Sequence, residues 1–448
     1  MDTTSTSPQF LTPEELAEDE AAALKAKRAQ KKIQEKAIVD RLTNQILCQD
    51  NPRLQAAELV MCENDILYFI NNFVFTYDPR EPFGEQDIPM LTYDYQNDFI
   101  GWLCHHIDAT VNGIAKRTML VEKSRDMGAS WVLVAVAVHY WLFKGGSVHF
   151  GSRTYDEADM LGDMGSLVEK VRFVIRRLPR WMWPVGFDPG KDMSFANIKN
   201  PASNNQITAE AASPEFCRGD RKTFVVMDEY ASWDNDEAAL KAVQGGSTNA
   251  LILISTPKGP FNKFAKLAND EDKVQVEKYR IHWTQHPVKS AGQRSLEGKP
   301  TSYWYRQQCA AMTAEDIASE LDIKYETSTK GLIFDDYQEI HRGHNLSPIG
   351  SGRIIRIQDP GVHWFVLFAQ VDPYGRLLVL DEHYDEQAYV GDIAWAVKEK
   401  SQRWKGYGFD DCGDPNGENR QAGSQELSDY DVMREEHDID PDTSMFDG

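Results

Sequence analysis

Short apolar segments of β type alternate with helical segments between residues 117 and 254, and this alternation is the feature that most constrains the fold. The four apolar segments are 117–121, 147–151, 224–227 and 251–254. We expect a helix from Trp131 onward, after the first of them, and another over 161–178. Strands that alternate with helices predict a parallel sheet with helices on both faces, because the crossover connections place them there. The chain is therefore expected to have an α/β fold.

Composition and charge limit the classes of protein that this chain can represent. Its 448 residues suffice for two or three domains, each with its own core. Hydrophobic residues make up 41% of the chain and charged residues 26%, which is ordinary globular usage. The net charge of −22 argues against a protein that coats nucleic acid through its overall field, although it allows a local basic surface. Half of this net negative charge lies in residues 410–448, where thirteen acidic residues and two arginines give −11.

The sequence indicates neither a membrane segment nor a cysteine framework. The longest apolar run, 131–143, has thirteen residues including His139 and is too short for a bilayer. The N-terminus lacks the charged-then-apolar pattern of a signal peptide. The six cysteines are scattered without a C-x-x-C pair, so we expect no zinc site and no disulfide framework. These features predict a soluble intracellular protein.

The first 50 residues differ from the rest and predict an extension. Residues 1–11 are rich in Ser and Thr and are expected to be disordered. Thr12 then caps a helix, with Pro13 at its first position and Glu15 completing a capping box. This helix is expected to reach about Leu42. Its first half has few large apolar residues, which favours a solvated helix over one that binds a partner.

Further changes of pattern complete the division of the chain into domains. A helical apolar spacing over 54–75 precedes the α/β pattern, which ends near residue 330. Beyond a connector over 343–352, the sequence predicts strands over 354–357, 364–371 and 377–380, a helix over 392–404 and a strand ending at Phe409. The expected parts are an N-terminal extension over 1–50, a first domain over 51–335, a linker over 336–352 and a second domain over 353–448.

The segment 122–130 combines a strand end, a short polar loop and the start of a helix. At such a place, backbone N–H groups and the N-terminus of the helix can hold a phosphate chain. The ordinary phosphate-loop pattern ends in Lys followed by Ser or Thr, but here Ala129 stands at the lysine position before Ser130. On its own, the segment is explained equally well by a tight strand-to-helix turn that needs Gly128 for backbone reasons.

Two more of the predicted strands end in polar residues. The strand 223–227 leads into Asp228 and Glu229, an arrangement in which the aspartate can hold magnesium through water while the glutamate orients an attacking water. The strand 251–254 leads into the hydroxyl groups of Ser255 and Thr256, at the carboxyl edge where ligands bind in open α/β sheets. Core packing does not readily explain three polar strand ends in this order.

With these motifs, residues 60–430 resemble the large terminase subunits of tailed bacteriophages, the motors that package DNA into a procapsid. The resemblance implies a P-loop ATPase domain with a deviant Walker A loop, in which Lys123 or Arg125 at the start of the loop replaces the usual lysine. It also implies that Ser130 and Asp228 hold magnesium and that Glu229 of the Walker B motif is catalytic. The implied ATP-binding residues are Gln96, Lys123, Ser124, Arg125, Gly128, Ala129, Ser130 and Arg218. The implied coupling motif, which senses the γ-phosphate, is Ser255, Thr256 and Pro257.

Two of these assignments have alternatives. The segment 93–96 resembles the aromatic/Gln segment that contacts adenine in the family, but Gln96 is also explained as an amide on a helix surface. Arg218 resembles the arginine that the family places before the Walker B strand. A surface arginine explains it equally well.

A second set of carboxylates follows the strands of the second domain. Asp359 comes after the strand 354–357, and Asp414 lies in 410–417, after the strand that ends at Phe409. On sequence alone, these are the acidic turns that commonly end strands. The terminase resemblance instead implies an RNase H-like nuclease domain in which Asp359 and Asp414 are catalytic and bind Mg²⁺ or Mn²⁺. The family's third acid lies well beyond this segment, and the tail shows no clear apolar strand or helix, so we expect an incomplete nuclease domain.

The resemblance implies ATP-driven translocation of viral double-stranded DNA into the procapsid, with endonucleolytic cutting of concatemeric DNA. The implied partners are that DNA, the portal protein, the small terminase subunit and further copies of the chain in a ring. The implied location is the host cytoplasm, transiently at the portal, with no membrane. A helicase-like ATPase without nuclease activity and a nucleotide-binding assembly component without turnover remain alternatives. A local DNA surface could be formed by Lys170, Arg172, Arg176, Arg177 and Arg180, which a solvated helix face explains equally well.

Overall fold

The computed structural model describes residues 11–111, 117–219, 221–244, 248–269, 276–296, 298–325, 343, 346–361, 363–386, 389–418 and 427–444. The chain divides into two compact units, Met1–Ile333 and Phe334–Gly448. Most of the expected linker 336–352 lies outside the described residues. The same holds for residues 1–10 of the N-terminal segment that we expected to be disordered.

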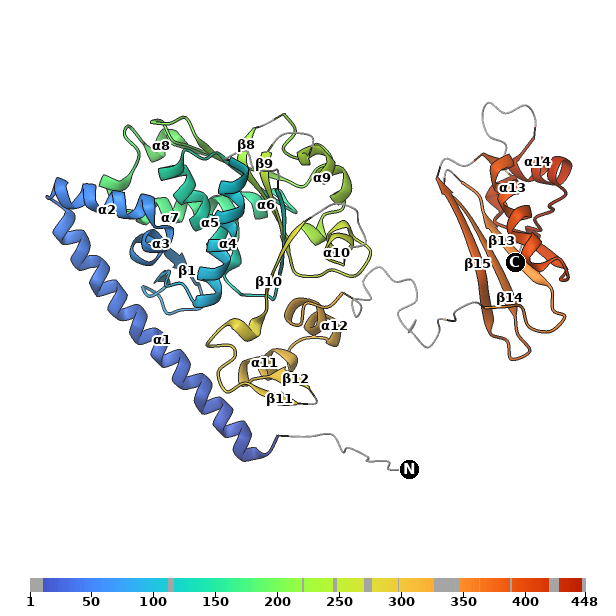
Figure 1. The fold of residues 1–448 in the computed structure, drawn as a ribbon, viewed down its shortest axis with the longest axis horizontal. Coiled ribbons are helices and arrows are strands. Elements are labelled where there is room, and N and C mark those ends of the chain that lie inside the picture. Colours follow the sequence, from blue (N-terminus) through green and yellow to red (C-terminus); the bar gives the residue numbers. More distant parts are fainter. Residues whose placement is uncertain are drawn as a thin grey trace. The chain divides into compact units, whose positions relative to one another are not determined.

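The first unit is built on an eight-stranded sheet that confirms the predicted α/β class (Figure 1). Six neighbouring strands, from β10 to β7 in sheet order, are parallel, and β6 and β5 add an antiparallel edge. In sheet order the strands are β10 (Glu277–Ile281), β3 (Arg117–Lys123), β9 (Thr248–Ser255), β8 (Lys222–Asp228), β4 (Val148–Ser152), β7 (Gln206–Ala211), β6 (Asn197–Lys199) and β5 (Met193–Ser194).

Helices cover both faces of this sheet, and alternate strand residues enter two separate cores. In β3, Met119 and Val121 belong to one core while Leu120 belongs to the other, as the two-residue period of a strand requires. The first core contains residues of α4 (Asp94–Val111), α5 (Ala129–His139) and α7 (Leu167–Arg177). The second contains residues of α9 (Asp236–Gln244) and α10 (Lys263–Ala268).

Helix α5 begins at Ala129, two residues before the predicted start, and is apolar on every side. All but two of its residues are buried, and a π-helical turn, Tyr140–Lys144, continues it. A helix that is hydrophobic all round belongs inside a core. The loop between β3 and α5 is therefore attached to a helix that is packed inside the core.

The N-terminal helix α1 (Pro13–Cys48) has the predicted start and the predicted largely exposed surface, with only three buried residues. Thr12 and Glu15 form the capping box. Asp19 is buried and accepts hydrogen bonds from the guanidinium groups of Arg294 and Arg306, both at 2.8 Å. Arg41 is also buried, and it donates to the backbone carbonyls of Val74 and Asn71, both at 2.7 Å. The helix is therefore mostly solvated, as predicted, and these two buried side chains attach its two halves to the rest of the first unit.

The expected single helix over 54–75 is two helices and a strand. Helix α2 (Pro52–Asn64) ends before Asp65, whose carboxylate accepts from the backbone N–H groups of Leu67 and Tyr68 and so caps α3 (Ile66–Phe73). Strand β1 (Phe75–Tyr77) then pairs with β2 (Asp87–Pro89). The remaining short elements of the unit are α6 (Tyr155–Ala158), α8 (Pro189–Asp192), β11 (Arg294–Leu296), β12 (Lys299–Thr301), α11 (Tyr303–Cys309), α12 (Ala314–Asp316) and the π-helical turn Ile317–Leu321.

The structure removes Arg172 from the candidate basic surface on the helix over 161–178. The helix begins only at Leu167, and Arg172 lies in the protein interior, where its guanidinium pairs with Asp159 at 2.5 Å and Glu169 at 3.1 Å. Arg176 pairs with Glu169, and Arg177 pairs with Asp87. A buried guanidinium needs such partners, so the charge of Arg172 serves the fold, whereas Arg176 and Arg177 remain partly exposed.

The second unit has a four-stranded sheet in the order β15-β14-β13-β16, packed against two helices. The strands are β13 (Ile354–Asp359), β14 (His363–Val371), β15 (Leu377–Glu386) and β16 (Phe409–Gly413), and the helices are α13 (Val390–Ser401) and α14 (Asp429–His437). Only β16 runs parallel to its neighbour, β13. The expectation that the tail has no helix is wrong, because α14 buries Tyr430 and Met433 in this unit's core.

Among the described residues, no helix has the length and apolarity that crossing a membrane requires.

Candidate functional site

Three of the predicted strand-end motifs meet at one edge of the large sheet. Strands β3, β9 and β8 are adjacent and parallel, with Glu122 beside Ser255 and Asp228 beside Ile254. The loop after β3, the hydroxyls after β9 and the acids after β8 therefore emerge at the same carboxyl edge, the usual ligand edge of such sheets.

The centre of this edge is an ion pair between Lys123 and Glu229. The Lys123 side chain is almost fully buried, and its Nζ donates to Glu229 Oε1 at 2.7 Å. The other carboxylate oxygen, Oε2, accepts from the hydroxyl of Ser255 at 3.2 Å. Burial is the largest single effect and alone would lower the pKa of Lys123 and raise that of Glu229. The attraction between the two groups and their other charged and hydrogen-bonding neighbours together outweigh burial, so the lysine pKa is raised and the glutamate pKa lowered. Both side chains are therefore charged at neutral pH.

Asp228 has a different environment from its neighbour in sequence. Burial, followed by the charge of Glu229, raises the pKa of Asp228 to about 6, against the opposing effect of Lys123. Its Oδ1 atom is buried and has no hydrogen-bond partner in the described part of the chain. A buried carboxylate oxygen without a partner is costly, and a hard divalent cation or its bound water would satisfy it. The residue therefore fits the predicted magnesium role.

The loop between β3 and α5 turns through two residues with left-handed backbone. Asp126 and Gly128 have positive φ values of 60° and 71°. Gly128 precedes α5 directly, and a Cβ atom there would lie 2.9 Å from Nε2 of Gln96. Ala129 is buried, whereas Ser130 is half-buried in the first turn of α5. The positive φ favours glycine at this position, and a Cβ there would also require the end of the Gln96 side chain to shift.

Ser124 serves the fold of the loop and not phosphate binding. Its hydroxyl donates to the carbonyl of Leu321 at 2.6 Å and accepts from the backbone N–H of Trp283 at 3.0 Å. Its own N–H donates to the carbonyl of Ile281 at 2.8 Å. Because these groups are already bonded inside the protein, we withdraw Ser124 from the predicted ATP-binding set.

A cavity of about 270 Å³ lies beside the Lys123–Glu229 pair. Among the predicted residues, Lys123, Arg125, Glu229 and Thr256 line it. Sequence reasoning missed five others, which are Arg153, Glu157, Ser232, Lys258 and Glu320. Lys258 directly follows the predicted coupling motif 255–257, so extending that motif by one residue would have found it. Glu320 lies far away in sequence and gives no such signal.

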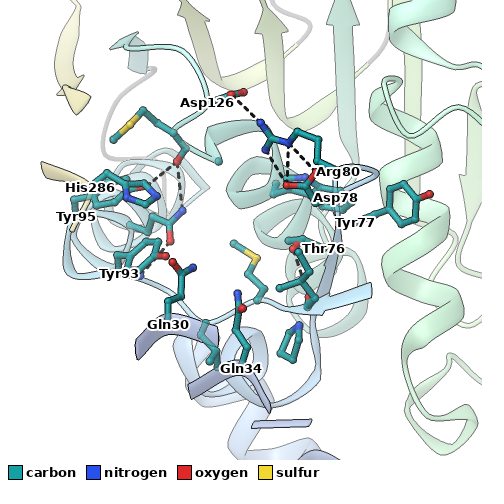
Figure 2. Close-up of a pocket in the computed structure, with 18 of the residues that line it drawn as sticks. Gln30, Gln34, Thr76, Tyr77, Asp78, Arg80, Tyr93, Tyr95, Asp126 and His286 are labelled. Carbon is teal, nitrogen blue, oxygen red and sulfur yellow. Dashed lines mark hydrogen bonds and ion pairs between the residues drawn. The ribbon is translucent and has the colours of Figure 1, made fainter. Parts of the chain in front are cut away.

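A second cavity, of about 390 Å³, is lined by the other end of the same loop, Asp126, Met127 and Gly128. Gln96 lines it too, and its side chain bonds the backbone of Tyr93 and Met127. The rings of Tyr93 and His286 lie 4.7 Å apart at its wall. Figure 2 shows Gln30 and Gln34 of α1 at one end of this cavity and Asp126 with Arg80 at the other. The aromatic and amide groups provide the surfaces that a nucleobase needs.

Arg218 is not brought to either cavity lined by the phosphate loop. It is exposed in the loop between β7 and β8, and its guanidinium pairs with Glu215. The alternative interpretation, a surface arginine, agrees with this position.

In the second unit, Asp359 and Asp414 lie at the ends of adjacent parallel strands. Asp359 ends β13, and the N–H of Asp414 donates to the carbonyl of Gln358 at 2.9 Å. Burial, followed by the charges of these two acids, raises the pKa of Tyr430, whose ring lies beside them. In the part of the chain that the structure describes, no group of three or more His, Cys, Asp or Glu side chains could hold a metal ion. The two acids are brought together, but a third ligand is not.

Residues 120–357 match the family model described as the N-terminal part of the T4likevirus-type terminase large subunit. The match covers more than half of the chain, so the chain belongs to the terminase large subunit family. No curated protein matches its sequence.

Among solved structures, similarity extends to the large terminase of a thermophilic bacteriophage in complex with ADP, with 11% identity and a TM-score of 0.38 over 72% of this chain and 78% of that one. The large terminase ATPase domain of Thermus phage P74-26 has 21% identity and a TM-score of 0.31, over 49% of this chain and 93% of that one. The Phi-28 gp11 DNA packaging motor has 10% identity and a TM-score of 0.28, over 73% and 91%.

Proposed function

We propose that this chain is an ATPase that drives viral double-stranded DNA into a procapsid, and that it also cuts concatemeric DNA in a metal-dependent reaction. In this proposal residues 51–335 are the motor, 336–352 the linker and 353–448 an RNase H-like nuclease. Residues 1–50 are an extension of the motor. The proposal joins membership of the terminase large subunit family to the chemistry of the two sites.

The observation that carries the ATPase proposal is the arrangement of Lys123, Asp228 and Glu229 beside a phosphate-type loop. It supplies a buried cation, a carboxylate oxygen that lacks a partner and a second carboxylate that stays charged. Lys123 binds the terminal phosphates, Asp228 and Ser130 hold magnesium, and Glu229 orients the attacking water. Magnesium, when bound, neutralises charge that develops on the phosphates.

Other residues position the nucleotide. The N–H groups around Gly128 and Ala129 face the phosphates at the start of α5, where the helix dipole favours an anion. Arg125 contacts the same phosphates from the side. Gln96 and Tyr93 contact the adenine in the second cavity. Ser255 bonds Glu229, so the coupling motif of Ser255, Thr256 and Pro257 relates the catalytic carboxylate to the γ-phosphate.

The nuclease proposal is supported by the strand order of the second unit and by its two acids. An antiparallel meander with a fourth strand parallel to the first is the arrangement that an RNase H-like sheet requires. Asp359 and Asp414 meet at the end of the parallel pair. Because the described residues offer no third carboxylate there, we derive no metal-dependent step and expect weak cutting.

The proposed partners follow from the packaging reaction. They are viral double-stranded DNA, the portal protein, the small terminase subunit and further copies of this chain in a ring. The reaction takes place in the host cytoplasm, with transient docking on the portal. The Phi-28 gp11 structure is described as a DNA packaging motor, and we transfer that role to this chain as part of the proposal.

The direct test is ATP hydrolysis by the purified chain, alone, with linear duplex DNA and with empty procapsids. Turnover that rises with procapsids and DNA together supports packaging. Turnover stimulated by nucleic acid alone, with strand separation, indicates the helicase alternative. ATP binding without turnover under every condition indicates an assembly component.

Two variants test the assigned roles. Glu229→Gln should bind ATP nearly as well as the parent but lose turnover by roughly 10²-fold or more, because water is no longer oriented. Lys123→Ala should lose ATP affinity as well, because it removes the buried cation. Glu237→Gln in α9, an exposed glutamate paired with Lys263, is the matched control and should hydrolyse ATP normally. Near-parental turnover in both site variants would refute the assignment.

A further inference from the structure

Glu320 lies between two cations of the proposed phosphate site. Its Oε2 accepts from a guanidinium nitrogen of Arg125 at 2.6 Å, and its Oε1 lies 3.5 Å from Nζ of Lys258. Its side chain is only 16% exposed, so water weakens these pairs less than it does on an open surface. All three residues line the cavity beside Lys123 and Glu229.

The two cations come from the two loops that would surround a terminal phosphate. Arg125 belongs to the phosphate loop, and Lys258 follows the coupling motif at 255–257. A carboxylate that bridges a guanidinium and an ammonium presents the same oxygen acceptors that a phosphate presents. Glu320 therefore occupies, within the protein, the position of an anionic ligand.

The backbone around Glu320 is attached to the same loop independently of its carboxylate. The Arg125 N–H donates to the carbonyl of Glu320 at 2.7 Å, and the Ser124 hydroxyl donates to the carbonyl of Leu321 at 2.6 Å. Farther along, the Tyr325 hydroxyl donates to the carboxylate of Glu122 at 2.9 Å. These bonds hold the segment 320–325 in place, so the Glu320 side chain can leave the two cations without the segment detaching.

We propose that Glu320 is a positioning residue that competes with the γ-phosphate for Arg125 and Lys258. Without a triphosphate it keeps the two cations at the cavity, and a bound γ-phosphate displaces it. A diphosphate has no group to displace it, so Glu320 sets how the site discriminates between ATP and ADP. This inference rests on the proposed function, because it needs a nucleotide in this cavity.

The test compares the affinities of a non-hydrolysable ATP analogue and of ADP, each with Mg²⁺, by calorimetry. Glu320→Gln keeps the shape of the side chain but removes its charge. It should bind the ATP analogue about threefold to tenfold more tightly than the parent, the range expected for one partly exposed ion pair, with ADP affinity unchanged. Glu315→Gln, in the same region but outside the cavity, is the matched control and should match the parent for both ligands.

Glu320→Asp provides a second variant should the glutamine form fail to fold. Its shorter side chain retains the charge but loses reach, so the ATP analogue should bind with an affinity between those of the parent and an uncharged variant. If the unmodified chain binds neither nucleotide, the proposed function and this inference both fail. If it binds both, and removing or shortening Glu320 leaves the ratio of the two affinities unchanged, this inference alone is overturned.

Discussion

Asp228 and Glu229 are consecutive residues whose carboxylates have opposite surroundings. Glu229 receives two hydrogen bonds, one of them from a lysine ammonium, whereas Asp228 leaves one oxygen without a partner. Their pKa values therefore shift in opposite directions, which is how a site assigns different roles to two acids. The backbone of Glu229 lies in the left-handed region, with φ of 50°. Its side chain therefore does not continue the alternation of side chains between the two faces of β8.

The raised pKa of Asp228 predicts a pH-dependent stability. Its folded pKa of about 6 exceeds its ordinary value of 3.8, so the folded chain holds a proton that the unfolded chain releases within this window. Stability is therefore lost as the pH rises through it. Asp228→Asn does not titrate, so without metal or nucleotide its stability relative to the parent should rise between about pH 4 and pH 6. Above about pH 6 the stability of Asp228→Asn relative to the parent should stay constant, about 3 kcal/mol higher than its value at low pH.

Urea unfolding of the parent and of Asp228→Asn from pH 4.5 to 7.5 measures this difference. The exposed Asp234→Asn is the control for the substitution itself. A difference between Asp228→Asn and the parent that is the same at every pH would contradict the prediction.

The sequence identified the residue types of the site but not how they pair. Lys123, Asp228 and Glu229 could be chosen because each directly follows or ends an apolar strand. The Lys123–Glu229 pair joins residues 106 positions apart, and only the strand order brings them together. Glu320 could not be chosen at all, because it lies in a π-helical turn with no motif around it. For the same reason, nothing local indicated that Arg172 would be buried against Asp159.

At the scale of elements, the apolar strands β3, β4, β8 and β9 of the large sheet were predictable, whereas the polar strands β10 and β6 of the same sheet were not. Strands β8 and β9 are buried on both faces and therefore read as continuous apolar runs. Strand β10 lies at an edge and has the polar sequence Glu277–Ile281, and β6 is as polar as a loop. The break between α2 and α3 could have been predicted from Asp65, a strong N-cap residue.

The attachment of α1 gives a prediction at this scale. Asp19→Asn removes the buried charge that pairs with Arg294 and Arg306, so the N-terminal half of the helix should loosen. We expect a loss of about 2 kcal/mol in the unfolding free energy and faster proteolysis near residue 19. Because Gln30 and Gln34 of the same helix line the second cavity, ATP affinity should also fall.

Glu18→Gln is the matched control for this change. Glu18 also pairs with Arg294, at 2.8 Å, but its side chain is 73% exposed. An exposed pair of this kind contributes less than about 1 kcal/mol. Equal losses of unfolding free energy in Asp19→Asn and Glu18→Gln would show that the burial of Asp19 does not add to the stability.

At the scale of the whole molecule, each proposed activity depends on residues of a single unit. The strands around Lys123 all belong to the first unit, and the two acids Asp359 and Asp414 both belong to the second. Whether one proposed site has all the residues that it needs therefore does not depend on the other site.

Asp359→Ala should abolish any cutting of plasmid DNA while ATP hydrolysis stays within about twofold of the parent. Cutting by the parent should be weak, should require Mg²⁺ or Mn²⁺ and should stop on chelation. Asp410→Ala is the control, because Asp410 is an exposed aspartate of the same unit that pairs with Arg353. Cutting that survives chelation, or that persists in Asp359→Ala, would show that these acids are only turn residues.

The attachment of α1 also sets an order of events during synthesis. Asp19 emerges from the ribosome well before its partners Arg294 and Arg306, which follow 275 and 287 residues later. The nascent helix therefore cannot pair this carboxylate while the strands of the large sheet are being made. Closing so long a loop is slow relative to local folding. The N-terminal half of helix α1 is consequently among the last parts of the first unit to dock.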